Sequence, residues 1–316
     1  MEKILIFGNG QFGNFYKKFF NSKKIKSKIS KANITKTNQI SKAITSYKPT
    51  VVINTAAKTN LEWCEEHKLE TFEVNSLGAD NIANICDKKG IYFIHLSSGC
   101  IFLSKNKNDK KKEDDKPNPV SYYSWTKVWS EQLIQYNKSS NFKYLILRPR
   151  QPISAQVSYK NMLVKFLTFT RFIDVPNTGT VIEDLMEWTR MLIKKRYVGI
   201  LNASNDGWTT PYKIANLLKK YVLPELPITK ISKEELNKLT PVMRIDTILD
   251  NSKLKSVIGK KYVKPYEDRL VEITQELDGN IKKAPKKVIK EELDKTLKQS
   301  RKRTIVNKVW KNLLDK

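Results

Sequence analysis

A glycine-rich turn near the N-terminus places the strongest constraint on how this chain can fold. The short apolar run from Ile4 to Phe7 ends in Gly8-Asn9-Gly10-Gln11-Phe12-Gly13, and aromatic residues then recur at helical spacing. In such a strand–turn–helix, the first glycine permits the tight turn and the second lets the backbone approach a pyrophosphate. The third lets the helix pack closely on the strand. Phosphate then binds to free N–H groups at the helix start. A glycine turn without a ligand is the alternative.

Strand–helix units repeat along the first half of the chain. Apolar runs suited to strands lie at 4–7, 51–54, 92–97 and 144–148, and a further strand is expected around 26–29. Helical patterns lie between them at 37–47, 69–88 and 123–136. This alternation predicts the α/β class, with a Rossmann-type doubly wound parallel sheet. In such a sheet, ligands bind at the carboxyl ends of the strands.

Residues at those strand ends indicate a dinucleotide site. We expect it to be formed by Gly8, Gly10, Gln11, Phe12, Gly13, Lys31, Ala56, Ala57, Lys127 and Arg150. The second strand ends without the Asp or Glu that usually binds the ribose of NAD, and Lys28, Ser30 and Lys31 lie there instead. A basic residue at this place pairs with a 2′-phosphate, which favours NADPH. NADH is the alternative, because these lysines also fit the lysine-rich composition of the whole chain.

The strand–helix rhythm weakens after residue 150. We therefore predict a Rossmann domain at 1–150, and a smaller substrate-binding region at 151–278 that partly returns to the Rossmann domain. Residues 279–316 form a basic C-terminal extension, with 13 Lys and Arg residues against four acidic ones. Ile289, Leu293 and Leu297 are at helical spacing there, which predicts one or two added helices.

The net charge of +27 over 316 residues suggests nucleic acid as a partner. Outside the extension, however, the charge is spread thinly, which is typical of a solvated lysine surface. We therefore do not expect nucleic acid to bind. The extension is assigned to assembly or to contact with an acidic partner, and a homodimer is kept open. The chain has no apolar run long enough to span a bilayer and no secretory pattern at its start, so we expect a cytoplasmic protein without a membrane segment.

Cysteines and histidines do not indicate a metal site or a disulfide framework. Cys64, Cys86 and Cys100 are too few and too scattered for either. His95 lies in a buried-strand pattern, and His67 follows a Glu pair at a helix start. We expect His95 to be a satisfied core residue and His67 to be at the surface, so no metal and no histidine base are predicted.

Tyr123 and Lys127 form a YxxxK pair on a predicted helix. Residues four apart share a helix face, so the phenol and the ammonium point the same way. The lysine charge favours the phenolate and lowers the tyrosine pKa from its usual value of about 10, which gives a usable general acid or base. Ser98 (or Ser97), at the end of the preceding strand, can hydrogen-bond the same carbonyl oxygen. A Tyr/Lys pair at the surface is the alternative.

The order of these motifs resembles the extended short-chain dehydrogenase/reductases, and within them the dTDP-4-dehydrorhamnose reductase group. Closer still, several segments look like the bifunctional UDP-4-keto-6-deoxy-glucose 3,5-epimerase/4-reductases, which make UDP-L-rhamnose in plants and some large DNA viruses. These segments are NLEWCE (60–65), SGCIF (98–102), YSWTK (123–127), RPRQPIS (148–154) and IDVPN (173–177). The resemblance covers residues 1–278.

This resemblance implies a second set of chemical residues. A bifunctional enzyme must remove the protons at C3 and C5, next to the C4 ketone, and return them on the other face. The resemblance assigns this step to Cys100 and Lys165, and a thiol near a cation is suited to it. Simple reductases of the group carry Asp-Tyr where this chain has Gly99-Cys100. A small buried apolar side chain is the alternative role for Cys100.

The resemblance also implies which residues bind the substrate: Asn75, Gln151, Asn161 and Arg244. Asn75 resembles an asparagine that supports the active-site helix, with a solvent-facing side chain as the alternative. Arg244 looks like an arginine that grips the nucleotide diphosphate, for which the guanidinium fork is suited. The chain departs from the family here, because Ile245-Asp246-Thr247-Ile248 replaces a more polar run.

The sequence thus predicts an NADPH-dependent enzyme that converts UDP-4-keto-6-deoxy-glucose to UDP-L-rhamnose. Three alternatives stay open. One is a single-function 4-reductase, the second a non-catalytic NADP-binding regulatory subunit, and the third a nucleic-acid-associated protein suggested by the charge.

Overall fold

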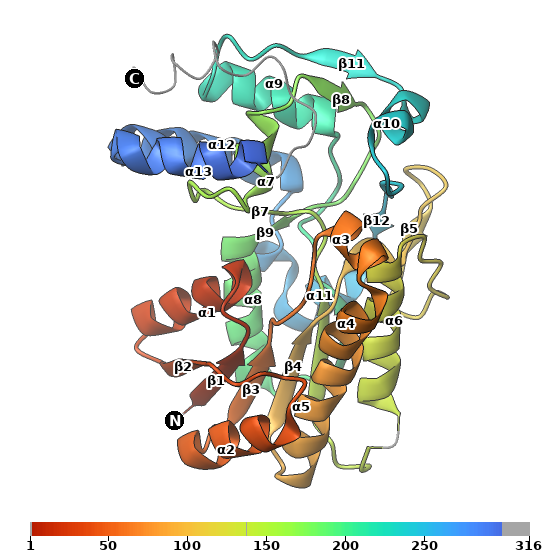
Figure 1. Ribbon diagram of the computed structural model, residues 1–316, viewed down its shortest axis with the longest axis vertical. Coiled ribbons are helices and arrows are strands. Elements are labelled where there is room, and N and C mark those ends of the chain that lie inside the picture. The colour runs from red at the N-terminus through yellow and green to blue at the C-terminus, as the bar shows by residue number, and fades with distance from the viewer. Residues whose placement is uncertain (1, 137, 299–316) are drawn as a thin grey trace.

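The computed structural model describes residues 2–136 and 138–298, and its central element is a six-stranded parallel sheet (Figure 1). The strands lie in the order β10-β6-β4-β3-β1-β2. Their bounds are Lys3–Phe7 for β1, Lys26–Ser30 for β2, Val51–Asn54 for β3, Tyr92–Leu96 for β4, Tyr144–Arg148 for β6 and Gly199–Asn202 for β10. The predicted α/β class and parallel sheet are confirmed. The sixth strand, β10, comes from beyond residue 150.

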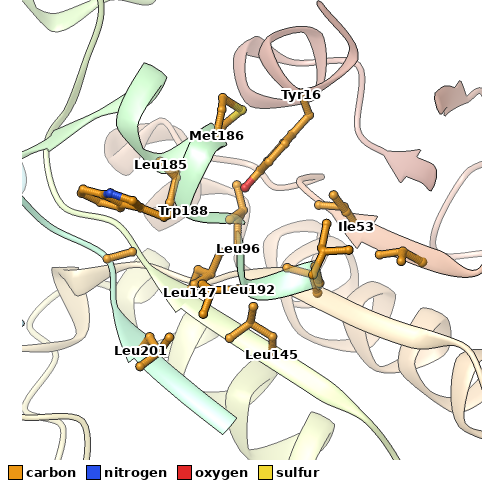
Figure 2. Close-up of a cluster of buried hydrophobic side chains, with 14 of the residues drawn as sticks. Tyr16, Ile53, Leu96, Leu145, Leu147, Leu185, Met186, Trp188, Leu192 and Leu201 are labelled. Atoms are coloured by element: carbon orange, nitrogen blue, oxygen red, sulfur yellow. The ribbon is translucent and has the colours of Figure 1, made fainter. Parts of the chain in front are cut away.

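Helices cover both faces of this sheet. One face carries α1 (Gln11–Ser22), α8 (Ile182–Lys195) and α11 (Ser252–Ile258), and the other carries α2 (Thr37–Tyr47), α5 (Gly78–Lys88) and α6 (Tyr122–Gln135). Because neighbouring strand residues point to opposite faces, Ile4 and Ile6 pack under α1 while Leu5 and Phe7 pack under α2. Figure 2 shows the first of these two cores, in which Tyr16 and Trp188 lie over the sheet.

The winding of the sheet reverses at its first strand. β1 pairs with β2 on one side and with β3 on the other, both in parallel register. The chain leaves β1 toward β2 but leaves β3 in the opposite direction, toward β4, and this divergence opens a crevice at the carboxyl ends of β1 and β3. Gly8 follows β1 directly at that edge. The fold thus places the glycine turn where ligands bind in sheets of this type.

The rest of the chain forms a smaller unit at the carboxyl edge of the sheet, drawn above it in Figure 1. Its helices are α7 (Met162–Phe166), α9 (Pro211–Tyr221), α10 (Lys233–Leu239), α12 (Tyr266–Lys283) and α13 (Lys286–Lys298). Its strands pair as β7 (Pro152–Ile153) with β9 (Thr180–Val181), β8 (Arg171–Ile173) with β11 (Thr229–Ile231), and β12 (Ile248–Leu249) with β5 (Lys110–Lys111). These short strands connect helices around a third apolar core.

The described part of the basic extension belongs to that third core. The boundary predicted after residue 278 falls inside α12, which runs unbroken to Lys283. Ile289 and Leu293 of α13 are buried together with residues of α7 and α9, and Leu297 packs against the same cluster. The predicted helical spacing is therefore present. The helices are not merely added on, because their apolar stripe completes the core beneath them. Residues 299–316 lie outside the described residues.

Candidate active site

Three glycines shape the turn after β1, each for a different steric reason. Gly8 has a φ of +105°, a conformation that L side chains rarely adopt. A Cβ on Gly13 would lie 1.9 Å from the carbonyl oxygen of Gly8, so α1 approaches β1 this closely only without a side chain there. A Cβ on Gly10 would meet no heavy atom within 4 Å. The turn therefore leaves open space at the N-terminus of α1.

A cavity of about 650 Å³ lies beside this turn. Its lining residues are Gly8, Asn9, Ile29, Ser30, Lys31, Ala32, Asn33, Ile34, Ala56 and Val74. Ala57 follows Ala56 and is half-buried, and Phe12 packs its ring against the core under α1. Lys31 is exposed at the end of β2, where no acidic residue lies. The cavity therefore runs from the glycine turn to a basic side chain.

The side chain of Gln11, the first residue of α1, gives a separate observation on what the start of this helix accepts. Its Nε2 is buried and has no hydrogen-bond partner among the residues that the structure describes. A buried amide donor without an acceptor is destabilising. A phosphate oxygen at the start of α1 would supply that acceptor, in the place where helix N–H groups also favour an anion. The residues present therefore fit a dinucleotide.

Gly13→Ala is expected to lower the free energy of unfolding by about 1–3 kcal/mol, as overpacking usually does, and to weaken NADPH binding. The added methyl group would meet backbone rather than a movable side chain. Urea unfolding and NADPH fluorescence titration measure the two effects. Gly279→Ala is the matched control, because a Cβ there meets nothing within 4 Å and alanine favours the α12 helix. Wild-type NADPH affinity in Gly13→Ala would contradict the prediction.

Tyr123 and Lys127 lie in the first half of α6. Ser121 caps this helix by accepting a hydrogen bond from the backbone N–H of Ser124 at 3.2 Å. Lys127 is 1% exposed, and its Nζ donates to the carbonyl oxygen of Leu96 at 2.7 Å. Ser98, two residues after β4 ends, hydrogen-bonds to Tyr123. The fold thus brings the predicted tyrosine, serine and lysine to the carboxyl end of β4.

The electrostatics of this group differ from the expectation that Lys127 lowers the pKa of Tyr123. Burial raises the pKa of the Tyr123 phenol above its usual value, and the Ser98 hydrogen bond and the Arg150 charge only partly oppose this. The ammonium of Lys127 is turned to the Leu96 carbonyl oxygen, and Ser98 and Arg150 are the main groups that oppose the effect of burial. Tyr123 is therefore a protonated phenol at neutral pH in this structure, which suits an acid rather than a base.

Reduction is expected to slow as the pH rises through about 8. Burial lowers the pKa of Lys127 from 10.5 to about 8, with the nearby Glu131 carboxylate opposing the shift. The ammonium is therefore present below this pH and lost above it, so kcat/KM should fall about tenfold per pH unit on the alkaline side. A pH profile of the wild type against Lys127→Gln measures this. If the loss of activity at alkaline pH persisted in Lys127→Gln, the titration behind it would belong to another group.

Cys100 lies beside a buried guanidinium. It follows Ser98 in a single 3₁₀ turn (Gly99–Ile101), and its Sγ accepts a hydrogen bond from Nη1 of Arg150 at 3.2 Å. Nη2 of Arg150 donates to Asn177 Oδ1 at 2.8 Å and to the Ile245 carbonyl oxygen at 2.5 Å. Arg150 is predicted to bind the cofactor, yet these contacts direct its side chain to the thiol. They place a cation beside the thiol, as the predicted role of Cys100 would need.

Asn75 is buried in a π-helical turn (Glu73–Leu77), which lies between α4 (Lys68–Phe72) and α5 and interrupts the predicted helix 69–88. Its Oδ1 accepts from the Lys58 N–H at 2.7 Å, and its Nδ2 donates to the Lys58 carbonyl at 3.0 Å and to Thr126 Oγ1 at 3.1 Å. The solvent-facing alternative is wrong. With its donors and acceptor used, Asn75 holds α6 in place and does not point at a substrate.

The other predicted substrate residues are placed differently from one another. Asn161 is buried and caps α7, and its amide bonds the backbone of Ser154 and Gln156, so it organises that loop instead of facing outward. Lys165, which is predicted to act in the epimerisation and not in substrate binding, is half-buried on α7. Gln151 has a φ of +39°, and such strain in a residue other than glycine often marks a functional position. Arg244 pairs with Glu62 of α3 (Leu61–Glu66).

A buried charge network behind the site was missed from the sequence. Arg148 bonds Glu131 through Nε at 3.0 Å and Nη2 at 2.6 Å, and Ser97 donates to the same carboxylate. His95 lies beside this network, between Asn54 and Ser130, and burial holds its pKa well below 6.5. The prediction of a satisfied core histidine is confirmed. The Arg148–Glu131 pair connects residues 17 positions apart, which no local pattern reveals.

Residues 1–278 match the sequence family described as the RmlD substrate binding domain. The chain belongs to the RmlD substrate-binding domain family.

Two relatives of this RmlD-family chain come from the plant Arabidopsis thaliana. It is 31% identical over 265 residues to the trifunctional UDP-glucose 4,6-dehydratase/UDP-4-keto-6-deoxy-D-glucose 3,5-epimerase/UDP-4-keto-L-rhamnose-reductase of Arabidopsis thaliana. That match covers 80% of this chain but only 39% of the relative. It is 32% identical over 224 residues to the bifunctional dTDP-4-dehydrorhamnose 3,5-epimerase/dTDP-4-dehydrorhamnose reductase of the same plant, covering 67% of this chain and 73% of the relative.

Solved structures agree with the RmlD fold. The UDP-rhamnose synthase of Acanthamoeba polyphaga mimivirus superimposes with a TM-score of 0.80 at 24% identity, over 87% of this chain and 99% of that one. A dTDP-4-dehydrorhamnose reductase of Clostridium acetobutylicum superimposes with a TM-score of 0.75 at 25% identity, over 86% and 98%. The first of these comparisons establishes the fold alone.

Among the described residues of the RmlD-family chain, neither a metal-ligand cluster nor a membrane-spanning helix is present. Residues 2–136 and 138–298 contain no group of three or more His, Cys, Asp or Glu side chains that could hold a metal ion. None of their helices is both long and apolar enough to cross a membrane. A larger hollow of about 950 Å³ lies between α4 and α6, but its lining includes none of the predicted catalytic residues.

Proposed function

We propose that this chain is an NADPH-dependent 4-keto-sugar reductase that also epimerises its substrate, converting UDP-4-keto-6-deoxy-glucose to UDP-L-rhamnose. The observation that carries the proposal is the contact between Cys100 and Arg150 beside the Ser98–Tyr123 hydrogen bond. One site then holds the groups for two proton transfers of different kinds. The two plant relatives support the coarser function of a 4-keto-sugar reductase.

The cavity beside the glycine turn is proposed to hold NADPH. Gly8 and Gly10 leave room for the diphosphate, Gln11 donates to it, and Lys31 pairs with the 2′-phosphate. When bound, the cofactor supplies the hydride that reduces C4. NADH would lack the group that Lys31 recognises, so NADPH is the favoured form.

The reduction needs a proton for the C4 oxygen as the carbonyl becomes a hydroxyl. Tyr123 is the proposed donor, because burial keeps its phenol protonated at neutral pH. Ser98 is proposed to donate a hydrogen bond to the same oxygen and so to fix its position. Lys127 is proposed to hold its positive charge one helical turn from the phenol on α6, where it favours the phenolate that remains after transfer.

The epimerisation is proposed to use Cys100 and Lys165. The C4 carbonyl acidifies the hydrogens at C3 and C5, so a base can remove each proton and an acid can return one on the other face. The guanidinium of Arg150 contacts the Cys100 sulfur, so a positive charge lies beside the proposed acid/base group. Lys165 on α7 is proposed as the second group.

The experiment is turnover of UDP-4-keto-6-deoxy-glucose with NADPH in deuterated water, followed by NMR of the product. The proposal expects UDP-L-rhamnose carrying deuterium at C3 and C5. NADPH oxidation without this labelling would leave a single-function reductase. NADPH binding without turnover would instead favour the regulatory subunit. Cys100→Ala should lose the labelling, whereas Cys86→Ala, in the core under α5, should keep it.

The remaining assignments stay predictions. They are a cytoplasmic location, a homodimer, the absence of nucleic-acid binding, and an acidic partner for residues 279–316. Only the part of that extension up to residue 298 is described, and there its lysines at 282, 283, 286, 287 and 290 are exposed. Binding to DNA that fell steeply with salt would contradict the expectation about nucleic acid.

A further inference from the structure

One ion pair joins the nucleotide-binding half of the chain to the segment before β12. Nη2 of Arg244 contacts Oε1 of Glu62, although the two residues are 182 positions apart. Their side chains are 35% and 31% exposed, so both remain in contact with solvent. Arg244 is also the residue expected to take the substrate diphosphate. The group expected to bind an anion is thus already bound to one.

The Glu62 side of the pair is anchored to the active-site helix. Glu62 lies on α3, which Asn60 caps by accepting from the Trp63 N–H at 3.0 Å. Glu65 on the same helix accepts from the Tyr122 N–H at 2.7 Å. Cys64, between these two glutamates, is fully buried. The carboxylate of Glu62 is therefore held on a short helix tied to the residue next to Tyr123.

The Arg244 side of the pair is anchored next to Cys100. The carbonyl of Ile245 accepts from Arg150, whose other amino group contacts the Cys100 sulfur. Asp246 accepts from Asn177 at 3.0 Å and pairs with Lys233. The backbone that carries Arg244 is therefore fixed. The ion pair links the two groups of residues that surround Tyr123 and Cys100, one on each side.

We propose that Glu62 sets the affinity of the site for the nucleotide diphosphate by competing for Arg244. Without nucleotide-sugar the carboxylate occupies the guanidinium, and the diphosphate replaces it on binding. Carboxylate and phosphate both match the guanidinium fork, so one can substitute for the other. An ion pair this exposed is weak, whereas a diphosphate carries more charge than a carboxylate. This inference rests on the proposed function, because it takes a nucleotide diphosphate as the ligand.

The exchange has a consequence for specificity. A ligand must bind Arg244 more strongly than Glu62 does. An anion that carries a single charge therefore gains little binding energy from the contact with Arg244. A diphosphate gains, and it also frees the carboxylate of α3, which is tied to the start of the active-site helix. Glu62 thereby disfavours the binding of anions with less charge than a diphosphate at the place where the substrate phosphates are expected.

The test is the dissociation constant of UDP, measured by calorimetry on the full chain with NADPH present. Glu62→Gln is expected to bind UDP about threefold more tightly, the order of magnitude of an exposed ion pair. Arg244→Gln should weaken UDP binding, and adding Glu62→Gln to it should change nothing further, because the two effects act through one contact. The dissociation constant of NADPH should stay the same in all variants. Glu66→Gln, exposed on the same helix, controls for the lost charge.

Two outcomes would overturn the inference while leaving the proposed function standing. Weaker UDP binding by Glu62→Gln would mean that the carboxylate positions Arg244 for the ligand. Unchanged binding would mean that the pair does not restrain Arg244. If the wild type bound neither UDP nor dTDP and turned over no nucleotide-sugar, the proposed function would fail and this inference with it. Thermal melting of each variant checks that the fold is kept.

Discussion

Replacing Tyr123 with phenylalanine is expected to lower kcat for NADPH oxidation by about 10²–10⁴-fold, the usual contribution of a positioned general acid. The ring stays and the proton donor is lost, so the C4 oxygen must take its proton from solvent. Stopped-flow absorbance of NADPH measures the change. NADPH affinity should be unaffected, since Tyr123 does not line the cavity beside the glycine turn.

The neighbouring residue provides a matched control for this variant. Tyr122 also lies at the start of α6, but its ring packs against Trp129 at 5.8 Å between ring centroids. Tyr122→Phe is therefore expected to retain most of the activity. Deuterium should still enter at C3 and C5 with Tyr123→Phe, because the proposed epimerisation uses other groups. A loss of only a few-fold in kcat would rule out Tyr123 as the proton donor.

Removing Glu131 is expected to destabilise the fold by about 3–5 kcal/mol, because it leaves the Arg148 guanidinium buried without its counter-charge. The two side chains are only 4% and 5% exposed, and the guanidinium contacts the carboxylate through two nitrogens. The free energy of unfolding of Glu131→Ala in urea measures the loss. Glu267→Ala breaks the exposed pair with Lys213 and should cost less than about 1 kcal/mol.

A double replacement separates charge from packing in this network. Glu131→Leu with Arg148→Met removes both charges and keeps the volume apolar, so most of the stability should return. Equal stability of Glu131→Ala and Glu267→Ala would show that the buried pair is not a major contributor. Glu131 also opposes the lowered pKa of Lys127, so the alkaline limit of activity should move to lower pH in Glu131→Ala.

The features that sequence patterns predicted well are those encoded locally. The strands 51–54 and 144–148 and the helix 37–47 appear at the predicted bounds, because apolar runs and helical periodicity fix them without reference to distant residues. The glycine turn is equally local. Gly8 and Gly13 meet the steric demands of one strand–helix contact, and Gly10 between them leaves open space.

What the sequence could not provide depends on contacts between distant segments. The π-helical turn holding Asn75 arises where its amide meets Lys58 and Thr126, 17 and 51 positions away. The direction of Lys127 depends on an accepting carbonyl from β4, and that of Arg150 on Asn177 and Ile245. Residue types alone predicted a lysine acting on the tyrosine, whereas the fold brings Arg150 close enough to do so.

The sheet described above also sets the order in which a nascent chain can acquire its structure. Five of its strands are complete by residue 148, but the edge strand β10 and the covering helices α8 and α11 follow only between residues 182 and 258. Until these elements emerge from the ribosome, Trp188 and Leu254 cannot cover the sheet face that carries Ile4, Ile53 and Leu145. Nascent chains of intermediate length therefore display an apolar surface of the kind that chaperones bind.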